Sequence, residues 1–462
     1  MFYFVYKYSE TLQISFNFVL KLLLSATMER LLHYVWKNRL MPREGLTTTD
    51  GQKIEILSVG IHNRDAGPDF FGADVIIGDE DWMGNVEIHT RSSDWYRHGH
   101  DKDEAYNNVV LHVAETVDAD VVTATGRKVP QLVLSVPEYV VENYQQLQAV
   151  EDYPPCYGIV ADLPRLITKS WLEYLADERL QGKVSEIERR LAFCEFDWER
   201  VLFITMASAF GFGTNSGVFE EWARQIPYSG AAKHRDNLFQ IEAMFLGVAG
   251  LLDEAVLSEA QKQRAPTDVY YQRLVGEYRF LANKFSLKSI GGYRWKFMRL
   301  RPQNFPTLRL ARFAALYCGM NLRLSSLVDA ADVGEVRKLL SGGVSDYWQH
   351  HYILCSPEVE EFVGCKMQKK SLDLLIINGV VPVLYAYGRY RGSKKLIEKA
   401  LAWLEALEPE DNKYIRLWRQ MGLVVSNARE SQAVLQQTNH YCNRRDCLRC
   451  RLGYRFIKQK KM

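Results

Sequence analysis

The chain has 462 residues, of which 47% are apolar and 25% are charged, and its formal net charge is +2. This length predicts two or three domains, and the composition is that of a globular protein with a full core. A net charge so close to zero excludes a uniformly basic surface, so any nucleic-acid-binding surface is local. The eight cysteines are unevenly spaced, unlike those of a secreted disulfide-rich domain, and we expect a cytoplasmic protein.

Residues 1–27 differ from the rest of the chain. The apolar stretch over residues 16–26 is interrupted by Lys21, is too short to span a bilayer and has no clean cleavage site after it. We expect an upstream extension, with the chain proper starting at Met28. A weak signal or anchor is the alternative, and we expect no stable membrane association.

Residues 28–150 predict one α/β domain with a central mixed sheet flanked by helices. The expected order is a helix over 28–39, strands over 54–59, 73–77 and 82–89, a polar helix over 100–108, and strands over 109–114 and 129–136. A turn cluster over 78–81 joins the second and third strands as a hairpin.

Residues 160–435 predict a mostly α-helical domain. Helical periods cover residues 171–193, 198–210, 238–256, 269–281, 308–320 and 394–407. Residues 374–384 are expected to form a buried helix that breaks near Gly379 and Pro382. Residues 154–158 have the composition of a linker between the two domains.

Two carboxylates are expected to converge at one edge of the sheet. Asp69 follows Pro68 before one strand of the hairpin, and Glu87 lies near the end of the other strand. Antiparallel strands joined by a turn bring their outer ends together, so the two side chains are expected side by side. Paired carboxylates bind a divalent cation such as Mg²⁺ or Mn²⁺, which can activate water for attack on a phosphodiester. The alternative is a purely structural role, in which Asp69 only caps a turn.

Pro68-Asp69, Glu87-Ile88-His89 and the order of predicted elements resemble the core of the PD-(D/E)XK, or restriction-endonuclease-like, nuclease superfamily. The resemblance implies that Asp69 and Glu87 bind metal and that the residue two positions after the glutamate orients or activates water. The superfamily has lysine there, whereas this chain has His89, whose imidazole can act as a base or a ligand. As a whole, the chain also resembles an uncharacterised bacterial family of unknown function.

Other polar residues near these motifs are candidates for the same site. Either Glu29 or Glu55 can supply a further acidic group, and the sequence does not choose between them. Arg64 and Arg91 flank the two motifs and suit phosphate binding. His112 lies inside an apolar strand and is expected to be a hydrogen-bonded core residue.

His98 and His100 offer a different metal site in the same region. Imidazoles are frequent ligands of Zn²⁺ and Mn²⁺, so a His/Asp metallohydrolase is an alternative to the nuclease. For any one histidine of this loop, a structural role is the simpler interpretation.

The C-terminal segment, residues 436–462, has the spacing H-x-C-x4-C-x2-C. The candidate ligands are His440, Cys442, Cys447 and Cys450, and the fourth position can also be filled by Cys156 or Cys355. A structural Zn²⁺ is the first expectation and a [4Fe–4S] cluster, which some superfamily relatives carry, is the second. Basic side chains with interleaved aromatics in this segment suit a nucleic-acid backbone, and a solvated basic tail is the alternative.

Together these features predict a metal-dependent phosphodiesterase, a nuclease acting on DNA or RNA. The alternative from another class is a catalytically inactive nuclease-fold module that binds nucleic acid or protein. We expect nucleic acid as a partner and no small-molecule cofactor, because the glycine-rich loop over 211–217 lacks the sequence of a P-loop.

Overall fold

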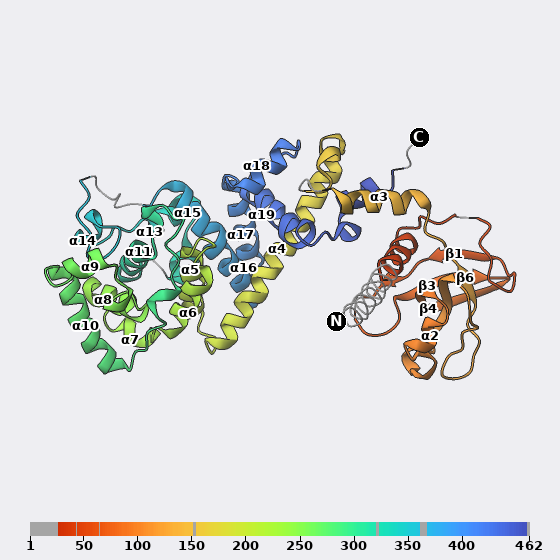
Figure 1. Cartoon of the computed structure of the whole chain (residues 1–462), viewed down its shortest axis with the longest axis horizontal. Helices are drawn as coiled ribbons and strands as arrows, with labels where there is room; N and C mark the ends of the chain where they lie inside the picture. The colour runs from red at the N-terminus through yellow and green to blue at the C-terminus, as the bar shows by residue number, and fades with distance from the viewer. Residues whose placement is uncertain are drawn as a thin grey trace, which may run out of the picture. The chain divides into compact units, whose positions relative to one another are not determined.

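The computed structural model describes residues 26–42, 44–63, 65–150, 154–319, 323–360 and 367–459 (Figure 1). Contacts divide the chain into two compact units. The described residues of Met1–Asp162 and Asn439–Met462 form the sheet unit, and those of Leu163–Thr438 form the helical unit. The helical unit is therefore inserted into the sequence of the sheet unit. The predicted extension over residues 1–27 lies almost entirely outside the described residues.

The sheet unit contains the predicted mixed sheet. Its strands in the described part of the chain are β1 (Ile54–Ser58), β2 (Ile61–His62), β3 (Phe70–Ile77), β4 (Glu80–Arg91), β5 (Val109–Thr116) and β6 (Gln131–Val133). The strand order is β1-β3-β4-β5-β6, and β2 pairs with β3. β3 runs antiparallel to β1, β2 and β4, whereas β4, β5 and β6 run parallel to one another.

β3 and β4 form the predicted hairpin, and its register sets the position of both carboxylates. Gly78 in the turn has a φ of +65°, a left-handed conformation that glycine adopts without strain. Phe70 pairs with Val86, so the preceding residue Asp69 lies opposite Glu87.

β4 and β5 form the buried centre of the sheet. Residues 86–90 and 109–114 are all buried, as expected for strands covered on both faces. The described helix over residues 26–37 packs on the sheet, and the indole N–H of Trp36 donates to the Val59 carbonyl over 3.1 Å.

The segment between β4 and β5 does not form the helix that we predicted over 100–108. It consists of the short helix α2 (Asp94–Arg97) and two 3-10 turns, His100–Lys102 and Glu104–Tyr106. Asp103 separates the two turns because its backbone is extended and its side chain accepts from the Ala105 N–H over 2.9 Å. Local side-chain capping therefore overrides a helix-compatible composition.

The sheet unit ends with elements that come from both sides of the insertion. They are α3 (Glu138–Ala149), the 3-10 segment Tyr157–Asp162, the π-helical turn Gln437–Cys442, the 3-10 turn Cys447–Arg449 and α20 (Arg451–Ile457). The amide of Asn143 in α3 donates to the carbonyls of Ile457 and Gln459 over 3.1 and 2.8 Å. The C-terminal segment is therefore fastened to α3.

The helical unit confirms the predicted change to a mostly helical architecture. Its α-helices are α4 (Arg165–Phe193), α5 (Trp198–Phe210), α6 (Ser216–Gln225), α7 (Tyr228–Ala232), α8 (Leu238–Val248), α9 (Glu259–Arg264), α10 (Val269–Phe285), α11 (Pro306–Cys318), α12 (Leu324–Asp329), α13 (Val333–Leu340), α14 (Asp346–His350), α15 (Lys369–Leu375), α16 (Val381–Tyr390), α17 (Lys394–Ala406), α18 (Lys413–Gln420) and α19 (Ala428–Gln436). Shorter 3-10 turns are Glu254–Val256, Gly292–Arg294 and Pro302–Asn304. The helix predicted over 238–256 ends early, at Val248.

The segment Lys369–Tyr390 is long and apolar enough to cross a membrane, but 72% of its most apolar window is buried inside the protein. It therefore belongs to the core of the helical unit. A π-helical turn, Ile376–Val380, joins α15 to α16, so the predicted break near Gly379 is a local widening of one continuous helix. Gly379 lies so close to Met206 that a Cβ would be 2.5 Å from its sulfur atom.

Candidate metal centre

The structure places Asp69 and Glu87 side by side, each held by the backbone of the other's strand. The Asp69 N–H donates to Glu87 Oε2 over 3.0 Å, and the Ile88 N–H donates to Asp69 Oδ2 over 2.9 Å. Glu87 is only 5% exposed. The register of the β3–β4 hairpin thus fixes both carboxylates before any ligand binds.

This site holds more negative charge than its burial favours. Burial and, after it, the neighbouring Asp69 carboxylate together raise the pKa of Glu87 to about 9. Burial also raises the pKa of Glu29, again with a contribution from Asp69. A bound cation reverses this effect because it stabilises the ionised carboxylates. Glu29 is near enough to Asp69 for their charges to interact, whereas Glu55 is exposed on β1.

The helix over residues 26–37 contributes a histidine that the sequence analysis missed. His33 lies four residues after Glu29, so both side chains project from the same face of the helix. Its Nε2 atom is 3.3 Å from Asp69 Oδ2. Burial opposes protonation, but Asp69 and Glu29 outweigh burial and raise the pKa of His33. The spacing from Glu29 was the available signal in the sequence.

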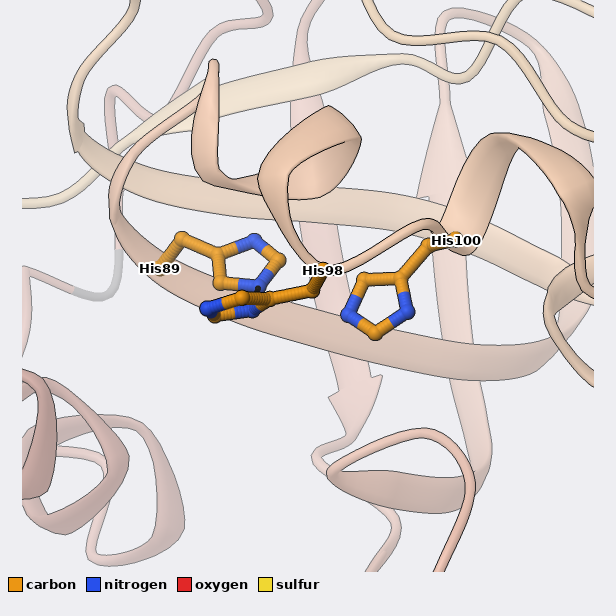
Figure 2. A group of neighbouring side chains, drawn as sticks. All are labelled: His89, His98 and His100. Carbon is orange, nitrogen blue, oxygen red and sulfur yellow. Dashed lines mark hydrogen bonds between the residues drawn. The ribbon is translucent and has the colours of Figure 1, made fainter.

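The imidazoles of His89, His98 and His100 gather in one place (Figure 2). His89 Nε2 and His100 Nε2 lie 3.5 and 3.2 Å from Glu87 Oε1. His98 Nδ1 lies 3.2 Å from His89 Nε2. One ring nitrogen from each of His89, His98 and His100 lies within 4.8 Å of the others, close enough to share one metal ion.

A chain of hydrogen bonds determines which nitrogen of His89 carries the proton. Gln131 Nε2 donates to the Ala119 carbonyl over 3.0 Å, so Gln131 Oε1 accepts from His112 Nδ1 over 3.3 Å. His112 Nε2 then accepts from His89 Nδ1 over 2.9 Å. The network therefore leaves a lone pair on His89 Nε2, directed toward Glu87 and His98. Metal-binding imidazoles are usually oriented by an outer partner in this way.

Burial favours the neutral form of His89, His100 and His112. It lowers the pKa of His89 to about 2, with the neighbouring imidazoles adding to the effect, and lowers the pKa of His112 to about 4. It also lowers the pKa of His100. A neutral imidazole is the form that binds a metal. His112 is fully buried and hydrogen-bonded, as the sequence analysis expected.

Aromatic side chains pack against two of the imidazoles, those of His100 and His112. Tyr106 stacks on His100 with 3.8 Å between ring centroids. Trp95 meets the rings of His100 and His112 edge-on at 5.4 and 5.7 Å. The indole N–H of Trp95 donates to the Val122 carbonyl over 2.9 Å, which fixes that ring in turn.

The structure does not bring Arg91, one of the two predicted phosphate-binding arginines, into this cluster. Arg64 lies outside the described residues. Arg91 is exposed, and its guanidinium lies 3.5 Å from Asp118 Oδ2. Arg97, which the sequence analysis did not select, is the cation beside the imidazoles, with its Nη2 atom 3.5 Å from His98 Nε2 and 3.1 Å from Asp94 Oδ1.

The predicted C-terminal ligands lie in the sheet unit. Cys442 and Cys450 are buried, Cys447 is half-buried and His440 is exposed. Several basic side chains of this segment already have partners: Arg445 donates to the Val150 carbonyl over 3.1 Å, and Arg449 lies 3.1 Å from Asp446.

A family model described as "Protein of unknown function (DUF2851)" matches residues 29–413. The chain belongs to this family. The prediction of an uncharacterised family is thus confirmed, whereas the relationship to the PD-(D/E)XK superfamily stays a prediction. No curated protein and no solved structure matches the chain. Every candidate ligand from Glu29 to His112 falls inside the matched region of the DUF2851 family, and the three C-terminal cysteines fall outside it.

Proposed function

We propose that the chain is a divalent-metal-dependent phosphodiesterase acting on nucleic acid. The observation that carries this proposal is the convergence of Asp69, Glu87 and the lone pair of His89 Nε2 in one buried, negatively charged place. Two carboxylates and an oriented neutral imidazole form a donor set that fits a divalent cation.

The donor set favours Mn²⁺ over Mg²⁺. Carboxylate oxygens suit both ions, but imidazole nitrogen is a better ligand for Mn²⁺ and Zn²⁺ than for Mg²⁺. Asp69 and Glu87 would bind the ion through oxygen, and His89 would bind it through Nε2. A bound cation supplies Lewis-acid stabilisation of the phosphoryl group and lowers the pKa of a bound water.

The other residues hold the ligands and handle protons. Because burial holds the pKa of His89 near 2, His89 suits a ligand role better than a general-base role. His98 is the exposed member of the three imidazoles, so solvent and a substrate can reach it. Arg97 is exposed beside His98 and can contact a substrate phosphate, the role that we first assigned to Arg64 and Arg91.

The choice of nucleic acid as substrate rests on the resemblance of Pro68-Asp69 and Glu87-Ile88-His89 to the PD-(D/E)XK motifs. The topology around the motifs supports it, since the hairpin that carries them continues into a parallel pair, β4 and β5. The basic C-terminal segment, which belongs to the same unit, is a second local source of positive charge.

A second candidate is a metallohydrolase whose metal rests on imidazoles alone. The mutual proximity of His89, His98 and His100 favours it. This candidate requires His98 and His100 and tolerates the loss of Asp69, whereas the phosphodiesterase proposed above requires Asp69.

The test is hydrolysis of single- and double-stranded DNA and RNA by the full chain with Mg²⁺, Mn²⁺ or Zn²⁺. We expect Mn²⁺-dependent cleavage that falls at least ~1,000-fold in the Asp69→Asn/Glu87→Gln double variant, as expected when transition-state charge stabilisation is removed. Glu55→Gln, which changes an exposed acid on β1, is the matched control and should keep full activity.

Two outcomes contradict the proposal. Activity that survives in Asp69→Asn but disappears in His98→Ala/His100→Ala moves the metal to the imidazoles. No cleavage by the wild-type chain with any ion, together with nucleic-acid binding that the double variant retains, identifies an inactive binding module.

A further inference from the structure

Four cysteines come from opposite ends of the sheet unit's sequence, and the packing of α3 on the C-terminal segment brings these ends into one region. Cys156, Cys442 and Cys450 are buried and Cys447 is half-buried, and none of the four forms a disulfide. Burial raises the pKa of the Cys156 thiol well above its usual value, and the thiolates of Cys450, Cys442 and Cys447 would each raise it further. Charge interactions weaken with distance, so this effect agrees with the hydrogen bonds that join the two ends of the unit's sequence.

The backbone folds the three C-terminal cysteines toward one another. The 3-10 turn Cys447–Arg449 closes with the Cys450 N–H donating to the Cys447 carbonyl over 3.2 Å, which is the compact geometry of a C-x2-C pair. A second turn closes between the Arg445 N–H and the Cys442 carbonyl over 3.0 Å. Gly453 in α20 packs directly on this loop, because a Cβ there would lie 2.3 Å from the Cys447 carbonyl oxygen.

The same loop is fastened to the chain just before Cys156. The guanidinium of Arg445, which lies between Cys442 and Cys447 in sequence, donates to the carbonyl oxygens of Gln148 and, over 3.1 Å, of Val150. The Gln148 amide returns a hydrogen bond to the Arg445 carbonyl over 3.3 Å. These contacts hold the end of α3 and the cysteine loop in one place.

We propose that Cys156, Cys442, Cys447 and Cys450 form a four-thiolate site for one thiophilic metal centre, a zinc ion or an iron–sulfur cluster. Four cysteine sulfurs are a complete ligand set for either. The arrangement also selects among the possible fourth ligands. His440 is exposed, and Cys355 belongs to the helical unit, where its backbone N–H donates to the Tyr347 hydroxyl over 3.0 Å.

The site has a structural consequence for the inserted unit. Cys156 shortly precedes Leu163, the first residue of the helical unit, and Cys442 shortly follows Thr438, its last residue. A metal bound to both cysteines joins the two chain segments at which the insertion begins and ends. Closing so long a loop of chain stabilises the folded state chiefly by restricting the unfolded one.

The test counts metal in the full chain purified under reducing, anaerobic conditions. Zinc, iron and acid-labile sulfide are measured per chain, and X-ray absorption at the metal edge counts the sulfur ligands. The background variant Asp69→Asn/Glu87→Gln removes metal bound at the candidate metal centre, so that only the thiolate site is counted. We expect either one zinc with four sulfur neighbours at about 2.3 Å or iron with labile sulfide.

Three substitutions locate the site. Cys156→Ser should lower the retained metal at least ~10-fold, since a ligand is lost from a closed site. Cys194→Ser, at a buried cysteine of the helical unit, and His440→Ala should both retain it. If Cys156→Ser does not fold, the number of sulfur ligands in the background variant, which keeps all of its native cysteines, still tests the proposal. Three sulfurs with one nitrogen, retention of metal in Cys156→Ser, or no metal in the native cysteine set would each overturn the proposal.

Discussion

Two buried glutamates, Glu87 in the sheet unit and Glu242 in the helical unit, show how similar burial can serve different ends. Glu242 is 1% exposed and accepts from the hydroxyls of Tyr270 and Ser345 over 2.7 and 2.8 Å. Burial raises its pKa to about 7, while those two hydrogen bonds work in the opposite direction. Burial raises the pKa of Glu87 further, to about 9, and the Asp69 carboxylate beside it adds to the increase.

The difference lies in the neighbours. Glu242 faces neutral donors that satisfy both of its oxygens, so its environment is complete without a ligand. Glu87 faces a second carboxylate and imidazoles, one of which presents a lone pair. Without a cation, Glu87 holds a proton near neutral pH, whereas a bound cation would let both carboxylates ionise. The comparison thus separates a buried acid with a complete set of hydrogen-bond donors from one whose neighbours suit the metal proposed above.

The largest effect is expected at Glu87, where Mn²⁺ should reverse the sign of the stability change that Glu87→Gln causes. Because its pKa is raised from 4.5 to about 9, the folded state binds more protons than the unfolded state, and stability falls as the pH rises through that window. Without metal, Glu87→Gln should therefore stabilise the sheet unit at pH 8 by ~3 kcal/mol. With saturating Mn²⁺ the wild type should be the more stable protein. Amide hydrogen exchange of β4 and β5 measures both differences.

If Glu87→Gln destabilises the sheet unit equally with and without Mn²⁺, then Glu87 is a structural acid like Glu242. Glu55→Gln controls for the loss of a carboxylate on the same sheet.

The next effect concerns the orientation of His89. His112→Leu removes the acceptor of the His89 Nδ1 proton while filling a similar volume, so the lone pair on Nε2 is no longer fixed. We expect Mn²⁺ affinity to fall about 10–100-fold, as is usual when an outer partner of a metal-binding histidine is lost. Calorimetric titration measures it. Unchanged affinity in a folded variant would remove His89 from the ligand set.

A smaller effect is expected in the helical unit. Because the pKa of Glu242 is raised from 4.5 to about 7, its contribution to stability is largest at low pH and falls as the pH rises through this range. Between pH 5 and pH 8, the free energy of unfolding of the helical unit should fall by roughly 1–2 kcal/mol more in the wild type than in Glu242→Gln. Chemical unfolding at several pH values measures this difference. A difference that depends on Mn²⁺ would contradict the distinction drawn between Glu242 and Glu87.

The smallest effect is expected at Tyr106. Tyr106→Phe keeps the ring that stacks on His100 and removes only the hydroxyl. Metal affinity and activity should change by less than about threefold, because most substitutions that preserve packing have small effects. A larger loss in Mn²⁺-dependent cleavage would assign the hydroxyl to the reaction.

The sequence carried the parts of the fold that depend on local pattern. The period-two strands and the turn at Gly78 predicted the hairpin, and its antiparallel geometry predicted that Asp69 and Glu87 would be neighbours. α5 begins and ends at the predicted residues, and its start is fixed by Asp197, whose side chain accepts hydrogen bonds from the Glu199 and Arg200 amides.

The parts of the fold and of the site that depend on tertiary pairing could not be predicted from the sequence. His112 and Gln131 meet because β5 and β6 run parallel after a crossover, which no local pattern specifies. Asp103 interrupts a composition that suits a helix. The choice of Cys156 among several possible fourth ligands depends on the docking of the C-terminal segment against α3.

The most direct test of the account is the anomalous scattering of Mn²⁺ in crystals of the full chain grown near neutral pH with Mn²⁺ present. The account predicts one strong peak within about 2.0–2.4 Å of carboxylate oxygens of Asp69 and Glu87 and of His89 Nε2, the range typical of such ligands. A peak on His98 and His100 that leaves Asp69 free, or no peak in this cluster at saturating Mn²⁺, would contradict it.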